Sequence, residues 1–195
     1  SEQEKGSNDT LLVVGGGLTG MTAALEASKT GYPVHLVEKT GELGGYAAKL
    51  WKDVPMHTPY TDPVDSGVAE LIAAIEADDK ITVHLNSTIT KTSGAPGRFS
   101  ADISTESGST STENFGAIIQ ATGSKPYDAS KLEGFGYTEN PDVITSTELE
   151  KMLSNGGLKR PSNGSVPSRV LFVQCAGSRD EAHLRYCSSE CCAVS

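Results

Sequence analysis

The sequence lacks the features that membrane-spanning and nucleic-acid-binding proteins need. None of its apolar runs approaches the roughly 20 residues that a membrane span requires. Its 16 basic residues are outnumbered by 25 acidic ones, and the net charge of −9 gives no attraction to a phosphate backbone. Residues 1–9 contain no basic segment followed by an apolar one, so we expect a disordered tail and no signal peptide. These absences predict a cytoplasmic protein without a direct membrane span.

Cysteine is absent from the first 174 residues, and all four cysteines lie within the last 21. Without an export signal, this grouping indicates a set of ligands in a reducing compartment rather than a disulfide framework. Glycine and proline, by contrast, are plentiful, at 21 and 9 residues. For a chain of 195 residues this composition predicts a turn-rich α/β protein of one domain, or of one domain and a fraction.

Glycines cluster between an expected strand and an expected helix. The apolar residues 11–14 lead into Gly15-Gly16-Gly17-Leu18-Thr19-Gly20, and helix-forming residues continue over 21–29. A GxGxxG sequence between a strand and a helix is the fingerprint of dinucleotide binding. A glycine turn that serves packing alone is the alternative.

Each residue of this motif has an expected role. Gly15 permits a tight turn, Gly17 leaves room for a pyrophosphate, and Gly20 lets the helix pack closely on the sheet. Leu18 and Thr19 begin the helix, whose free N–H groups and positive dipole end favour phosphates. We therefore expect these five residues to contact a cofactor.

A carboxylate ends the second expected strand. A short buried strand is expected over 34–37, and Glu38 follows it, 18 residues after Gly20. In such folds a carboxylate at about this place hydrogen-bonds the ribose hydroxyls and repels a 2′-phosphate. We therefore expect Glu38 to bind the ribose, and we do not expect NADP.

Hydrophobic periodicity predicts the elements that follow. A helix is expected over 65–77 and a third parallel strand over 80–85. The runs 88–91 and 98–103 flank a turn rich in glycine, which is typical of a hairpin, and 110–115 continues the strand pattern. These three runs predict an antiparallel excursion from the parallel sheet.

The sequence pattern changes in the last part of the chain. Residues 145–148 have capping-box spacing, which predicts a helix that ends at the glycines 156–157. Residues 158–168 are expected to form a linker. The apolar run 169–174 then predicts a new buried strand, which leads into Cys175.

The four cysteines have the spacing C-x11-C-x3-C-C: Cys175, Cys187, Cys191 and Cys192. On a helix Cys187 and Cys191 would share one face, with Cys192 offset by about 100°. Iron–sulfur clusters and zinc both use thiolate ligands. Adjacent cysteines are unusual for zinc, which favours a cluster, but zinc and unligated or disulfide-bonded thiols stay open on spacing alone.

Two stretches resemble flavoproteins of the disulfide-reductase type. Residues 38–45 fit their ExxxxxGG continuation, and Ala121-Thr122-Gly123 resembles the ATG turn that closes over FAD. This resemblance implies FAD rather than NAD. It also implies cofactor contacts at further positions: Lys39, Gly44, Gly45, Ile89, Ala121, Thr122 and Gly123.

The cysteine region resembles a more specific family. Five segments are similar to the A subunit of heterodisulfide reductase and to flavoprotein subunits of quinone-interacting membrane-bound oxidoreductase. They are residues 172–180, Tyr186-Cys187-Ser188, Cys191-Cys192, 123–128 and 143–146. The resemblance implies that the four cysteines hold a [4Fe-4S] cluster beside an FAD. It further implies that the partners are other subunits of an electron-transfer complex.

This sequence departs from the family in two ways. Members often carry further cysteines, whereas this chain has none before Cys175. The chain stops at Ser195, so we expect it to lack the later flavin-binding segment and to bind FAD weakly alone.

Together the patterns predict an α/β fold in two parts. A Rossmann-like FAD-binding domain of the disulfide-reductase type, with the antiparallel excursion, is expected over 10–157. The start of a second Rossmann-like, cluster-binding domain is expected over 169–195. The predicted function is that of an oxidoreductase subunit that transfers electrons through FAD and a cluster, with no side chain as a catalytic acid, base or nucleophile. The alternatives are a thioredoxin-reductase-like enzyme, although C-x-x-C is absent, and a zinc-stapled scaffold.

Overall fold

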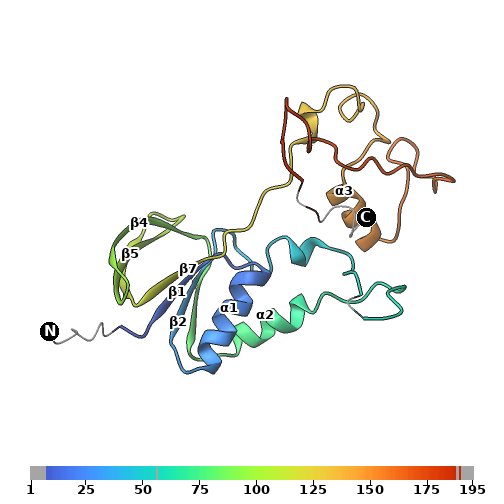
Figure 1. The fold of residues 1–195 in the computed structure, drawn as a ribbon. Coiled ribbons are helices and arrows are strands. Elements are labelled where there is room, and N and C mark those ends of the chain that lie inside the picture. Colours follow the sequence, from blue (N-terminus) through green and yellow to red (C-terminus); the bar gives the residue numbers. More distant parts are fainter. Residues whose placement is uncertain (1–7, 56, 188, 190–195) are drawn as a thin grey trace. The chain divides into compact units, whose positions relative to one another are not determined.

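The computed structural model describes residues 8–55, 57–187 and 189 (Figure 1). Contacts between residues divide the chain into two compact units. The first comprises the chain up to Ala48 together with Gly67–Ser124, and the second comprises Lys49–Ser66 and the chain from Lys125 onward. The domain limits expected from the sequence stay predictions, because this division by contacts does not define the limits of a flavin-binding domain.

A parallel sheet forms the centre of the first unit. Its four strands have the order β3-β2-β1-β7, with bounds β1 (Leu11–Val14), β2 (Val34–Val37), β3 (Ile81–His84) and β7 (Ala117–Gln120). The strands are short, largely apolar runs, as expected for a parallel sheet that is covered on both faces. In register, Leu11 lies opposite both Val34 of β2 and Ala117 of β7.

Two helices cover one face of this sheet: α1 (Leu18–Lys29) and α2 (Val68–Glu76) (Figure 1). Alternate residues of β1 face opposite sides, so Val13 packs on the helices while Leu12 faces away from them. The helix side of the core contains these buried residues: Val13, Met21, Ala24, Leu25, Val34, Leu36, Leu43, Val68, Ile75 and Ile81. The helix expected over 65–77 is confirmed by α2.

An antiparallel sheet covers the other face (Figure 1). Its strands are β4 (Ser87–Ala95), β5 (Arg98–Thr105) and β6 (Thr110–Phe115), in the order β4-β5-β6. Period-two side chains send Ala101, Ile103 and Phe115 inward, where they pack with Leu12 and Val37. The predicted Rossmann-like α/β fold with an antiparallel excursion is confirmed.

The second unit contains little regular structure. Its main element is α3 (Ser146–Ser154), with the short 3₁₀ turn η2 (Ala129–Lys131) before it; a second 3₁₀ turn, η1 (Ala47–Lys49), precedes the segment 50–66. Thr145 caps α3 by accepting a hydrogen bond from the N–H of Glu148, whose carboxylate in turn accepts one from the N–H of Thr145. The predicted capping box and helix are therefore confirmed.

The strand expected over 169–174 is wrong. Residues 169–173 are irregular and residue 174 lies in a turn; Leu171 is 85% exposed and Val173 is 52% exposed. The run is apolar enough for a buried strand, but a strand needs a neighbour to pair its backbone and side chains to cover its faces. The described residues supply neither, so they do not form the first strand of a second Rossmann-like domain.

No helix in the described part of the chain is both long and apolar enough to cross a membrane. The expected absence of a direct membrane span and the cytoplasmic location stay predictions.

Candidate functional site

Three glycine-containing turns lie at the carboxyl ends of strands in the parallel sheet. Residues 15–17 follow β1, residues 44–45 lie in the connection after β2, and residues 121–123 follow β7. Because β1 pairs in parallel with both β2 and β7, the carboxyl ends of these strands lie at the same edge. In open α/β sheets this edge is where ligands bind.

Gly15 joins the first and third turns. Its φ is +112°, and a Cβ atom added there would lie 2.1 Å from the carbonyl oxygen of Ala121. The N–H of Ala121 donates to the carbonyl of Val14 at 2.8 Å, and the N–H of Gly15 donates to that of Val37 at 2.8 Å. Only glycine fits between these backbones.

Gly20 brings α1 against the first turn. A Cβ atom at this position would lie 1.8 Å from the carbonyl oxygen of Gly15 and 3.4 Å from Cβ of Ala121. The close approach that the motif predicts for its third glycine is therefore present, and it fixes the start of the helix at the sheet edge.

The second glycine turn lies beside the first. The N–H of Gly44 donates to the carbonyl of Gly16 at 2.8 Å. A Cβ atom on Gly45 would lie 3.0 Å from Cα of Gly17. Both Gly44 and Gly45 have positive φ, at +106° and +56°, which favours glycine.

Gly17 faces open space at the centre of this arrangement. It is the N-cap of α1 and, as a glycine, has no side chain to cap the helix; a Cβ atom there would meet nothing within 4 Å. Leu18 and Thr19, in the first turn, are exposed. The first N–H groups of a helix have no acceptor within that helix, so this end favours an anion.

Glu38 is 7% exposed and contacts the first turn directly. Its Oε2 accepts a hydrogen bond from the N–H of Gly16 at 2.7 Å. Its Oε1 accepts hydrogen bonds from the N–H and the hydroxyl of Thr40, each at 2.8 Å. A carboxylate has about four acceptor positions, so these three bonds leave one for a ligand.

The same hydrogen bonds set the charge of Glu38. Burial acts to raise the pKa of this carboxyl group, but the hydrogen bonds from Thr40 and Gly16, with Lys39 nearby, outweigh burial and lower the pKa below 4.5. Glu38 is therefore ionised at neutral pH. An ionised carboxylate accepts a hydrogen bond from a ribose hydroxyl and repels a 2′-phosphate.

Sequence reasoning missed two residues of this site, Thr40 and Gly16. The spacing of two residues between Glu38 and Thr40 is a signal that could have found Thr40. Nothing local pairs Glu38 with Gly16, because they are 22 residues apart and meet only through the pairing of β1 with β2.

The other residues expected to contact the flavin differ in their exposure. Lys39, Thr122 and Gly123 are exposed at the sheet edge. Ile89, in β4, packs against the core cluster that lies under the antiparallel sheet. Its side chain therefore serves packing, and the expected contact of its backbone with adenine stays a prediction.

The loop between the first two cysteines, residues 175–187, folds on itself and is called here the cysteine loop. The N–H of Leu184 donates to the carbonyl of Gly177 at 3.1 Å, and the N–H of Arg179 donates to that of Tyr186 at 3.2 Å. Cys175 is half-buried with a φ of +59°, and Cys187 is exposed.

The remaining expected ligands, Cys191 and Cys192, lie outside the described residues, as does Ser188. The expectation that Cys187 and Cys191 share one face of a helix therefore stays a prediction. Among the residues that are described, no three Cys, His, Asp or Glu side chains gather as metal ligands. Cys187 Sγ does accept a hydrogen bond from the N–H of Ser189, at 3.4 Å.

Comparison with known proteins identifies the family. The sequence model of the family described as FAD dependent oxidoreductase matches residues 10–116, more than half of the chain. The chain belongs to this family. The matched residues contain two of the three glycine turns and Glu38, and FAD is the cofactor that the family description names.

Curated relatives of this FAD dependent oxidoreductase are heterodisulfide reductase subunits. It is 27% identical over 264 residues to the A subunit of the ferredoxin/F(420)H(2)-dependent CoB-CoM heterodisulfide reductase of Methanosarcina acetivorans, covering 93% of this chain and 33% of that protein. It is 45% identical over 86 residues to the A 1 iron-sulfur subunit of the CoB–CoM heterodisulfide reductase of Methanopyrus kandleri, covering 40% of this chain and 13% of that protein. The resemblance drawn from the motifs is confirmed.

The chain spans about a third of the length of the Methanosarcina relative. Among solved structures, thioredoxin reductase from Streptococcus pyogenes matches with a TM-score of 0.42 and 19% identity, covering 60% of this chain and 31% of that one.

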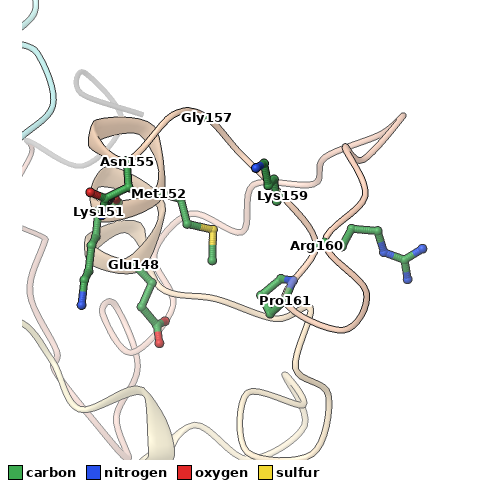
Figure 2. Close-up of a pocket in the computed structure, with 9 residues that line it drawn as sticks. Glu148, Lys151, Met152, Asn155, Gly157, Lys159, Arg160 and Pro161 are labelled. Atoms are coloured by element: carbon green, nitrogen blue, oxygen red, sulfur yellow. Dashed lines mark hydrogen bonds between the residues drawn. The ribbon is translucent and has the colours of Figure 1, made fainter.

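A pocket of about 470 Å³ lies beside α3 in the second unit of this FAD dependent oxidoreductase (Figure 2). Met152 points into it, whereas Arg160 turns outward, where its Nη2 lies 2.6 Å from Oδ2 of Asp142. Its lining consists of Glu148, Lys151, Met152, Asn155, Gly157, Lys159, Arg160, Pro161 and Gly164. None of these is an expected cofactor or metal residue.

Proposed function

We propose that this chain is an electron-transfer subunit that binds FAD and a [4Fe-4S] cluster in a heterodisulfide-reductase-like or quinone-interacting oxidoreductase complex. The observation that carries the FAD part is the meeting of three glycine turns and an ionised Glu38 at one edge of a parallel sheet. The name of the Methanopyrus kandleri relative, an iron-sulfur subunit, supports the cluster part.

The structural features of the first unit fit the AMP half of FAD. The open side of Gly17 and the uncapped start of α1 suit the pyrophosphate, and the remaining acceptor position of Glu38 suits a ribose hydroxyl. The residues proposed to contact FAD are Gly15, Gly17, Leu18, Thr19, Gly20, Glu38, Lys39, Gly44, Gly45, Ile89, Ala121, Thr122 and Gly123.

FAD, when bound, supplies the capacity to accept two electrons and release them one at a time. The chain's own residues position it. Glu38 holds the first turn through Gly16 while it orients the ribose, and its charge selects against a 2′-phosphate.

The cluster is proposed to bind through Cys175, Cys187, Cys191 and Cys192. The N–H group of Ser189 donates a hydrogen bond to Sγ of Cys187, and hydrogen bonds to the sulfur atoms are a feature of iron–sulfur sites. Such bonds also help to set the potential of iron–sulfur centres. The relatives named as subunits of a reductase make other subunits the proposed partners.

Anaerobic reconstitution of the full chain with FAD, iron and sulfide tests this function. We expect flavin absorption together with about four iron atoms and about four sulfides per chain. One zinc per chain without sulfide would favour the scaffold alternative. Thiols that change in number with reductant, without any metal, would favour a disulfide.

A further inference from the structure

A hydrogen-bonded pair of side chains joins the cysteine loop to a distant segment of the second unit. The hydroxyl of Tyr127 lies 2.6 Å from Nδ1 of His183, and the two residues are 56 positions apart. Their rings meet edge to face, with centroids 5.7 Å apart and planes at 88°. Edge-to-face aromatic contacts add stability beyond the area that they bury.

Gly177 makes this contact close. Its φ is +76°, and a Cβ atom there would lie 2.9 Å from Cδ1 of Tyr127 and 3.3 Å from Cδ2 of Leu132. The ring of Tyr127 therefore packs directly on the backbone of the cysteine loop. Any side chain at residue 177 would displace that ring.

Backbone hydrogen bonds connect the anchored residue His183 to the start of the cysteine loop. His183 is half-buried although Ala182 and Arg185 are exposed, so the loop turns inward at this point. The neighbouring Leu184 donates its N–H to the carbonyl of Gly177 and accepts a hydrogen bond from the N–H of Asp180 at 3.0 Å. A loop held at His183 is therefore also held at Gly177, two residues after Cys175.

The other end of the loop is fixed by a separate bond. The N–H of Arg179 donates to the carbonyl of Tyr186, the residue before Cys187. The N–H of Ser178 donates to the carbonyl of Cys175 at 3.0 Å. Consecutive residues 178 and 179 thus contact both ends of the loop, and the two cysteines cannot separate while this turn is intact.

We propose that Tyr127 and His183 are positioning residues that hold Cys175 and Cys187 in place for the metal centre. This inference rests on the proposed function, because it assigns the two residues a role toward the cluster. A metal site whose ligands are already placed loses less conformational entropy when the metal binds. Neither residue contacts the cluster in this proposal.

Variants that remove one group at a time test the pair. Tyr127→Phe removes the hydroxyl and keeps the ring on Gly177. His183→Asn retains a polar group near the position of Nδ1, whereas His183→Leu removes it. Tyr60→Phe is the matched control, because Tyr60 is 60% exposed and the described part of the structure shows no hydrogen bond of its hydroxyl.

Hydrogen exchange by mass spectrometry on the metal-free full chain measures the anchoring. In Tyr127→Phe we expect exchange of peptides from 175–187 to rise about fivefold, the factor typical of one lost hydrogen bond. Exchange in β1, β2 and α3 is expected to stay unchanged. His183→Leu should show at least the same rise, His183→Asn a smaller one, and Tyr60→Phe none.

Release of iron to a chelator from the reconstituted protein measures the effect on the metal centre. We expect release to be faster in Tyr127→Phe and His183→Leu by a similar factor, with partial rescue by His183→Asn. Unchanged exchange in the cysteine loop would overturn the anchoring, and faster exchange with unchanged iron release would overturn the positioning role. Wild-type protein that takes up no iron would refute the proposed function and this role together, while the exchange data still report whether the anchor exists.

Discussion

At the scale of single residues, the three glycines of the first turn serve different purposes. Gly15 and Gly20 are required by the protein itself, because a Cβ atom at either would lie within 2.1 Å of a backbone oxygen. Gly17 is not, since a Cβ atom there would meet nothing within 4 Å. The fold leaves room for a side chain at residue 17, yet the residue is a glycine at the centre of a ligand-binding motif. This points to the ligand as the reason why residue 17 is a glycine.

This difference makes the glycines a test of the flavin site. We expect Gly17→Ala to fold with a loss in the free energy of unfolding of about 1 kcal/mol or less, because alanine is less favourable than glycine at the N-cap of α1, but to lose FAD affinity because the methyl group occupies the place of the pyrophosphate. Gly20→Ala should instead destabilise the first unit. Urea denaturation and FAD titration of both variants measure this. Full FAD affinity in Gly17→Ala would exclude the turn as the phosphate site.

Glu38 carries the second prediction at this scale. Glu38→Gln removes the charge and places an amide donor close to the N–H of Gly16 or Thr40, so the ribose and the first turn both lose a charged acceptor. We expect FAD binding to weaken by roughly 1.5 to 3 kcal/mol, the range for a hydrogen bond to a charged group. Isothermal titration measures it, with Glu42→Gln, at an exposed neighbouring position, as the control. Equal affinities in the two variants would remove Glu38 from the site.

At the scale of elements, the sequence patterns predicted what local rules determine. Short apolar runs predicted β1, β2 and β3, and the spacing of Thr145 and Glu148 predicted the start of α3. The run 169–174 has the same apolar character as β1, yet it is irregular and exposed, because a strand depends on a neighbour that its own residues do not specify. The contact of Glu38 with Gly16 was unpredictable for the same reason, since it arises from strand pairing.

The packing of the two sheets against each other includes a pair of histidines. Nε2 of His84, in β3, lies 3.0 Å from Nδ1 of His35, in β2, and the ring of His35 meets Phe115 edge to face. Burial lowers the pKa of both histidines below 6.5; His35 lowers that of His84 further, and Glu113 acts in the opposite direction on each.

These pKa shifts predict acid sensitivity of the first unit. Below pH 6.5 the unfolded chain binds protons that the folded pair does not, so stability is complete above this pH and falls as the pH drops below it. The upper limit is about 1.4 kcal/mol per pH unit for each histidine. Melting temperatures from pH 8 to 5 measure the effect, and His84→Gln should flatten the curve. The carboxyl group of Glu38 also has a lowered pKa. The stability that this ionised group contributes is lost only below pH 4.5, at a lower pH than the effect of the histidines.

His57→Gln serves as the control, because His57 is exposed in the second unit. Its pH curve should match that of the wild type. If His84→Gln has the same slope as the wild type between pH 6.5 and 5, the histidine pair is not the source of the acid sensitivity.

At the scale of the whole molecule, the two candidate sites draw on different units. All three glycine turns and Glu38 belong to the first unit, whereas the cysteine loop and its anchor Tyr127 belong to the second. The contacts that define the glycine turns come from within the first unit, from residues such as Ala48, Val68 and Ala121. Substitutions at distant sites that share no partner usually have additive effects.

The last prediction is therefore that loss of the metal centre leaves the AMP half of the flavin site intact. The double variant Cys175→Ser, Cys187→Ser should lose iron and sulfide, because serine supplies no thiolate. Its FAD affinity is expected to stay within about twofold of that of the reconstituted, cluster-loaded wild type, since additivity for separate sites holds to about 0.3 to 0.5 kcal/mol. FAD titration of the variant and of chelator-treated wild type measures this. A large and equal loss of FAD affinity in both proteins would mean that the cluster supports flavin binding, and a loss in the variant alone would mean that the cysteine side chains themselves do.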